Sequence, residues 1–270
     1  MRKWSGWLLA GLMVAMPALP AFAQTQKASK TYVLKAARMF DGKSNTLSTP
    51  GLVVVTHGKI AGVGAKATIP AGAETIDLGD ATLLPGFIDA HTHLTSMYSD
   101  DWKQNTLDRL QKTVAEQALD ASANARVTLM AGFTTVRDVG SSDYLDVGLR
   151  NAISDGVVPG PRMLVTALAK GVKIGFGTDA AVYQHGRNAE EFHLMVDLGM
   201  KPFDALRSAA LADAELLGLQ DKIGTLDAGK LADIVAVPGN PGENIRQTEK
   251  VFFVMKEGTI YRNDRSAPQR

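Results

Sequence analysis

The stretch "GFIDAHTHL", residues 86–94, decides how the rest of the chain is interpreted. An apolar run from Leu83 to Ala90 is typical of a buried parallel strand, and it leads into His91 and His93. Side chains alternate between the two faces of a strand, so this pair points the same way and can bind one metal ion. The carboxyl ends of such strands are where α/β folds keep their sites. A His-x-His pair by itself, however, more often marks two polar residues that hydrogen-bond locally.

The composition indicates a soluble globular protein with a small-molecule partner. The chain has 270 residues, 45% hydrophobic and 21% charged, with a formal net charge of +1. Positive and negative side chains are interspersed, so no basic face is predicted that could neutralise nucleic-acid phosphates. The sequence contains no cysteine, and any metal site must therefore be made from histidines and carboxylates.

The first 23 residues predict a secretory signal peptide. Arg2 and Lys3 precede an apolar stretch that ends near Leu19, and a small-residue cleavage pattern lies at residues 21–23. The apolar stretch is far shorter than the ~20 residues that span a bilayer, which argues against a membrane anchor. We therefore expect a periplasmic or secreted protein with no membrane contact after cleavage.

Both ends of the chain are rich in β-strand patterns, and the middle is different. Residues 31–83 predict a small antiparallel sheet, and residues 226–263 have the same texture, so the two segments together are expected to form one composite β-sandwich domain. Residues 84–225 alternate strand-like and helix-like runs, which favours βα units around a parallel sheet. These about 140 residues leave room for four or five units of roughly 30 residues, and a closed eight-stranded barrel does not fit.

Within the middle, four strands and three helices are expected. The strand candidates are "LLPGFIDA", "FTTVRDVG", "PRMLVT" and "VKIGFGTD", at residues 83–90, 133–140, 161–166 and 172–179. The first helix follows apolar residues at i+3 and i+4 spacing, namely Leu119, Ala123, Val127 and Met130. The second begins at Asn188, whose side chain is expected to cap it together with Glu191, and ends near Gly199. The third runs from Pro202 to Gly218.

The stretches "LLPGFIDAHTHL", "GFTTVRDVG", "VKIGFGTDAAVYQHGRNAEEF" and "IGTLDAGKLADIVAV" resemble the amidohydrolase superfamily, and within it exported hydrolases similar to prolidases and imidazolonepropionases. The resemblance covers nearly all of the chain after the signal peptide. It implies a (β/α)8 barrel with one or two divalent metals, usually zinc, and a small β-sandwich made from the termini. Taken with the residue count, it predicts an incomplete TIM-like barrel with strands that resemble the first three and the last.

The resemblance also assigns roles to five residues. It implies that His91 and His93 bind the metal, and that Asp179 both ligates the metal and takes a proton from the attacking water. His185 and Arg187 are expected to bind substrate, although a loop histidine that satisfies backbone groups is an equal alternative for His185. Asp138 is expected to hydrogen-bond at the barrel rim rather than to ligate metal.

The sequence departs from the family pattern between residues 166 and 172. Family members also carry a bridging carboxylated lysine or a glutamate on the fourth strand and single histidines on the fifth and sixth, and these strands have no counterpart here. Lys170 and Lys173 precede the end of the last strand and are poorly placed to bridge two metals. His91, His93 and Asp179 would therefore make a mononuclear site with water as the fourth ligand.

The sequence thus predicts a metal-dependent amidohydrolase that cleaves the C–N bond of a small amide, a dipeptide or an N-acyl amino acid. Two alternatives remain open. One is a catalytically inactive, internally deleted remnant, and the other is a periplasmic metal-binding or scaffold protein without turnover. Unpaired strand edges and uncovered apolar faces predict dimerisation or aggregation. The sequence specifies neither the substrate nor the metal.

Overall fold

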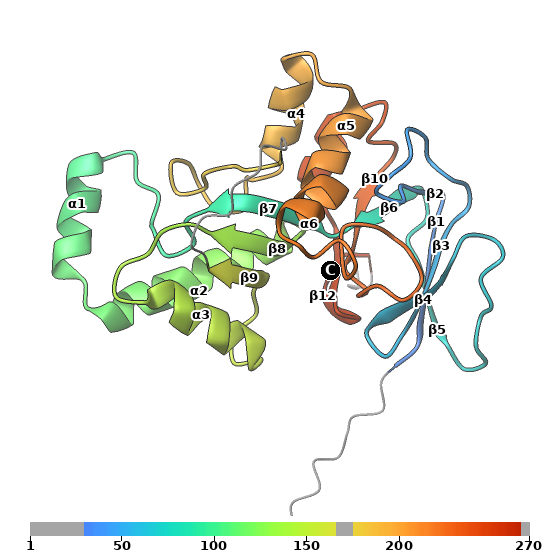
Figure 1. The fold of residues 1–270 in the computed structure, drawn as a ribbon, viewed down its shortest axis with the longest axis horizontal. Coiled ribbons are helices and arrows are strands. Elements are labelled where there is room, and N and C mark those ends of the chain that lie inside the picture. The colour runs from blue at the N-terminus through green and yellow to red at the C-terminus, as the bar shows by residue number, and fades with distance from the viewer. Residues whose placement is uncertain (1–29, 166–174, 266–270) are drawn as a thin grey trace, which may run out of the picture.

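The computed structural model describes residues 30–165 and 175–265 as an α/β protein with three β-sheets (Figure 1). The segment interpreted as a signal peptide lies outside the described residues, as do Lys170 and Lys173. In the described ranges, no helix has the length and apolar character needed to cross a membrane. The strands are β1 Tyr32–Ala36, β2 Arg38–Met39, β3 Gly51–Thr56, β4 Lys59–Val63, β5 Glu74–Asp77, β6 Ala81–Pro85, β7 Phe87–Thr92, β8 Phe133–Asp138, β9 Arg162–Val165, β10 Ile234–Pro238, β11 Phe253–Lys256 and β12 Thr259–Asn263. The helices are α1 Trp102–Gln111, α2 Val114–Met130, α3 Leu145–Ser154, α4 Glu190–Asp197, α5 Pro202–Arg207, the π-helix η1 Ser208–Ala212, α6 Asp213–Leu216 and the 3₁₀-helix η2 Ile245–Lys250.

The two ends of the chain form two sheets, rather than the single small antiparallel sheet expected for the N-terminal segment. One sheet has the order β4-β3-β1-β5, and the other has the order β12-β11-β10-β6-β2. The second sheet therefore combines strands from both ends of the chain. Parallel pairs, β1 with β5 and β2 with β6, occur beside the antiparallel ones. Leu34 and Val53 of the first sheet share an apolar core with Ile234 and Phe253 of the second.

The run from Leu83 to Ala90 is two strands and not the one that its apolar character predicted. Pro85 ends β6, which pairs antiparallel with β10, and Phe87 begins β7, which pairs parallel with β8. Gly86 lies between them, and a Cβ atom there would come within 2.2 Å of the Thr134 hydroxyl oxygen. The chain changes sheets at this residue because glycine lets the backbone approach β8 closely.

The parallel sheet has the order β7-β8-β9, and α2 and α3 lie against it (Figure 1). Residues 176–180 run beside β7 on the side away from β8, but they form only an isolated bridge, Thr92 with Ala180, and not the regular strand that was expected. The described residues thus contain parallel strands with helices, which confirms the α/β class, and they do not form a closed barrel.

An aromatic cluster beneath these strands fixes their arrangement. Phe87 of β7, Phe133 of β8, Phe176 and Phe192 of α4 are all nearly inaccessible to solvent, and neighbouring ring centroids lie 4.5–5.6 Å apart. Aromatic pairs at such distances contribute about 0.5–1.5 kcal/mol each beyond the area they bury. Because Phe176 belongs to this cluster, the segment that leads to Asp179 is held against β7.

Two of the expected helices differ from the prediction in detail. The helix α2 forms, but its buried face consists of Ala121, Asn124, Ala125, Thr128 and Leu129. Leu119, which contributed to the helical spacing, is 72% exposed. Asn188 does not cap α4, whose N-cap is Ala189 and lacks a side-chain hydrogen bond. The Asn188 side chain is instead buried and bonded to Asp89 and Thr178.

Candidate metal centre

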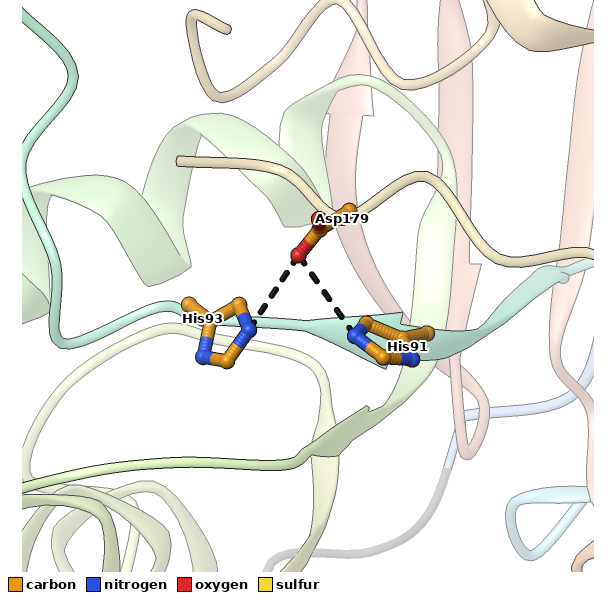
Figure 2. Close-up of side chains that lie close together, drawn as sticks. All are labelled: His91, His93 and Asp179. Atoms are coloured by element: carbon orange, nitrogen blue, oxygen red, sulfur yellow. Dashed lines mark ion pairs between the residues drawn. The ribbon is translucent and has the colours of Figure 1, made fainter. Parts of the chain in front are cut away.

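His91, His93 and Asp179 come together at the carboxyl end of β7, as the sequence predicted for a metal site (Figure 2). His91 is the penultimate residue of β7, and His93 follows the strand's last residue. The Asp179 Oδ1 atom lies 3.5 Å from His91 Nε2 and 3.2 Å from His93 Nε2. The side chains of His91 and Asp179 are about half exposed, at 49% and 50%, so a small molecule can reach this point.

The three donor atoms fit the ligand set of one divalent cation. All of them lie within 4.8 Å of one another. Zinc bonds imidazole nitrogen and carboxylate oxygen at about 2.0–2.2 Å, so tetrahedral ligand atoms are separated by about 3.3–3.5 Å. The two His–Asp separations agree with that spacing, and two imidazoles with one carboxylate are donors that zinc accepts. Three protein ligands would leave a fourth position open.

Asp179 occupies a strained backbone position. Its φ is 53°, in the left-handed region, and Ala181 has a φ of 129°. Non-glycine residues adopt such angles only where their surroundings enforce them, and strain of this kind is found at functional sites. Three backbone hydrogen bonds fix the segment to β7 and the residue after it: Ala90 N donates to Phe176 O at 2.9 Å, Asp179 N donates to His91 O at 2.8 Å, and His93 N donates to Ala180 O at 3.0 Å.

A buried polar network made of Asp89, Thr178 and Asn188 adjoins the three residues, and the sequence did not predict it. Asp89 and Asn188 are completely buried, and Thr178 is 5% exposed. The Asp89 carboxylate accepts four hydrogen bonds, from the backbone N–H groups of His91 and Thr178, from the Thr178 hydroxyl and from the Asn188 amide. Burial raises the pKa of Asp89, and these four bonds oppose the rise. An acidic residue inside the apolar run, on the same strand face as His91, was the only sequence signal of this network.

Asp138, at the end of β8, hydrogen-bonds at the rim as expected. Its Oδ2 atom accepts from Leu94 N at 2.6 Å, and its Oδ1 atom accepts from Gly140 N at 3.4 Å. Burial raises the pKa of Asp138 to about 6. The Gly140 carbonyl oxygen lies 3.4 Å from Nδ1 of His93. Asp138 therefore fixes the backbone on both sides of the His93 ring.

A cavity of about 350 Å³ opens beside His93. It lies between α1, the start of α2 and the loops that follow β7 and β8, and its lining includes Ser96, Met97, Lys112, Asp120 and Ser141. Lys112 and Asp120 form an ion pair at 2.7 Å. The cavity walls combine apolar surface with charged side chains of both signs, and this volume accommodates a small molecule.

The structure does not place His185 and Arg187 in that cavity. Both line a second cavity of about 490 Å³ between α2, the loop before α4 and β12. His185 Nε2 lies 3.0 Å from Ser96 O, and burial lowers the pKa of the His185 imidazole. Arg187 forms a bidentate ion pair with Glu190, at 2.6 and 2.8 Å. The substrate-binding role of these two residues stays a prediction.

Comparisons with known proteins find curated relatives of parts of the chain. A relative named imidazolonepropionase, from Idiomarina loihiensis, is 30% identical over 153 residues, which is 54% of this chain and 33% of that protein. A 5-methylthioadenosine/S-adenosylhomocysteine deaminase from Desulforudis audaxviator is 36% identical over 93 residues, 31% of this chain and 21% of its own length. The chain thus spans a third or less of the length of these curated relatives.

Solved structures share the fold at low sequence identity. A Xaa-Pro dipeptidase matches with a TM-score of 0.76 and 22% identity, covering 87% of this chain and 100% of its own. The ochratoxinase of A. niger matches with a TM-score of 0.71 and 16% identity, covering 87% and 96%. The model of the amidohydrolase family, finally, matches residues 82–168 and 163–262, which is more than half of the sequence. With its two histidines and one aspartate at the end of β7, this chain belongs to the amidohydrolase family.

Proposed function

We propose that the protein is a metal-dependent hydrolase that cleaves the carbon–nitrogen bond of a small amide, a dipeptide or an N-acyl amino acid. The observation that carries the proposal is the convergence of His91, His93 and Asp179 at separations that suit one zinc ion. Membership of the amidohydrolase family supports it, as do relatives named for hydrolysis or deamination of C–N bonds.

In this proposal, each side chain has a defined task. His91 and His93 would hold a divalent ion, and Asp179 would provide the third ligand. Such an ion would supply a water of lowered pKa and a Lewis acid for a carbonyl group. The Asp179 carboxylate, half exposed beside both imidazoles, accepts the proton that the attacking water loses. The cavity beside His93 receives the substrate. His185 and Arg187 line a separate cavity, so they orient this substrate only if the loop before α4 moves towards His93.

Zinc content tests the proposal most directly. We expect the dialysed protein to retain about one zinc per chain, and His93→Gln to weaken zinc affinity by more than about 100-fold, because losing a direct ligand costs more than losing a supporting hydrogen bond. His57→Gln is the matched control, since His57 lies in the exposed turn between β3 and β4. Elemental analysis and competition with a chromophoric chelator give both values. Equal affinity in wild type and His93→Gln would contradict the proposal.

Two candidates without catalysis remain. One is a protein that binds metal but hydrolyses nothing, and the other is an inactive remnant of a larger enzyme. Among the residues that the structure describes, this three-member cluster is the single group suited to a metal, so a second ion has no comparable ligands there. Hydrolysis of a dipeptide and N-acyl amino acid panel, with a rate abolished by a chelator and restored by zinc, would exclude both. Tight zinc binding with no hydrolysis would favour the metal-binding protein.

We also propose the organisation that surrounds the site. Residues 31–83 and 226–263 make one β-sandwich domain, supported by the core that their two sheets share, and residues 84–225 make a partial barrel. Export to the periplasm or the medium is supported by the N-terminal pattern of basic, apolar and small residues.

A further inference from the structure

We propose that Asp89 is the positioning residue of the metal centre, a buried carboxylate that holds the segment of Asp179 in register with the segment of His91. The inference rests on the proposed function, because it concerns the same three ligands. Asp89 does not itself ligate metal. It is completely buried, and both of its oxygens already accept hydrogen bonds from protein donors.

The hydrogen bonds of Asp89 connect the two chain segments that supply the ligands. Its Oδ1 atom accepts from His91 N at 3.1 Å and from Thr178 N at 3.2 Å, so one oxygen bridges a residue that carries a ligand and the immediate neighbour of Asp179. Its Oδ2 atom accepts from Thr178 Oγ1 at 2.5 Å and from Asn188 Nδ2 at 2.8 Å. A single side chain thus fixes the relative position of β7 and the Asp179 segment.

The Asp179 segment, residues 176–180, depends on these side-chain hydrogen bonds of Asp89 more than a regular strand would. In the described part of the chain, residues 176–180 join β7 through three backbone hydrogen bonds and form no continuous ladder. Asp179 and Ala181 have positive φ angles, and this strain is relieved if the segment is free to move. The bonds from Asp89 to Thr178 hold the residue immediately before the strained one.

Asn188 connects a third segment, the loop before α4, to the hydrogen bonds of Asp89. Its amide nitrogen donates to Asp89 Oδ2 and to Thr178 Oγ1, and its amide oxygen accepts from Gly186 N at 3.1 Å. The loop with His185 is thereby tied to the same carboxylate. This use of Asn188 also explains why its side chain does not cap α4.

Asp89→Asn is the informative variant, because it keeps the shape and replaces one acceptor oxygen by an amide nitrogen that faces two donors. We expect zinc affinity to fall at least tenfold, as it does when groups that orient metal ligands are removed. In the metal-free protein, amide hydrogen exchange over residues 176–180 should become at least tenfold faster. Asp233→Asn is the matched control, since Asp233 is 5% exposed and accepts hydrogen bonds from Arg162 and Glu257, away from the metal centre.

The outcomes separate this inference from the proposed function. A folded Asp89→Asn protein that binds zinc like the wild type, or an Asp233→Asn protein that loses as much affinity, overturns the role of Asp89. If Asp89→Asn does not fold, Thr178→Val removes one of the four bonds, and an expected loss of at least threefold in affinity takes its place; unchanged affinity overturns the inference. A wild type that binds no zinc overturns the proposed function, and the positioning role with it, even if the exchange data show that Asp89 holds the segment.

Discussion

Asp213, the first residue of α6, is a carboxyl group whose environment opposes ionisation. It is completely buried, its Oδ1 atom accepts from Phe176 N at 3.0 Å, and its Oδ2 atom has no partner among the described residues. Burial, with the nearby Asp89 charge, raises the pKa of Asp213 from an ordinary 3.8 to about 9. Between these two values the folded protein binds a proton that the unfolded chain releases, so Asp213 makes the free energy of unfolding fall as pH rises.

Asp213→Asn should therefore stabilise the protein at alkaline pH. The amide keeps an oxygen for Phe176 N and cannot ionise, so we expect the free energy of unfolding to rise by on the order of 5 kcal/mol at pH 8, with little change at pH 4. Urea denaturation of both proteins across this range measures the difference. Parallel pH profiles for the wild type and the variant would show that Asp213 does not titrate as its burial implies.

The helix α2 shows how an element can be predicted while its orientation is not. Its packed face is built from small residues, with Ala125 completely buried and close to where a Cβ on Gly160 would lie, whereas Leu119 on another face is 72% exposed. We expect Ala125→Leu to lower the free energy of unfolding by about 1–3 kcal/mol through overpacking. Leu119→Ala should change it by less than about 0.5 kcal/mol. Thermal and urea unfolding give both values, and a larger cost for Leu119→Ala would mean that this face of α2 is covered.

For the rest of the fold too, the sequence predicted features that depend on local patterns and missed those that depend on long-range contacts. The alternation of side chains along a strand placed His91 and His93 on one face, because it depends only on residues close in the sequence. Asp179 lies far away in the sequence, and only the family resemblance placed it beside the two histidines. The division of the strand at Gly86 depends on β8 and β10, and the burial of Asn188 depends on Asp89. The sequence predicted that Asn188 begins a helix, because asparagine often caps one. In the structure the Asn188 amide donates instead to the carboxylate of Asp89, which needs hydrogen-bond donors because it is buried.

At the scale of the whole molecule, the parallel sheet has an open edge. In the described ranges β9 pairs only with β8, and its other side presents backbone donors and acceptors that a second chain can satisfy. Large apolar side chains are also exposed at the two ends of α3, the helix that packs on β9, namely Tyr144 at 82% and Val157 at 74%. An edge strand flanked by apolar surface favours association between copies.

We therefore expect sedimentation velocity to show species heavier than a monomer. Leu164→Lys places a charge on the open edge strand, which is how natural proteins block edge pairing, and it should shift the distribution towards monomer. Leu198→Lys is the control, because Leu198 is 91% exposed at the end of α4 and belongs to no strand. A wild type that sediments as a single monomer at micromolar concentration would show that the edge of β9 is already protected, and would remove the physical reason for expecting a dimer.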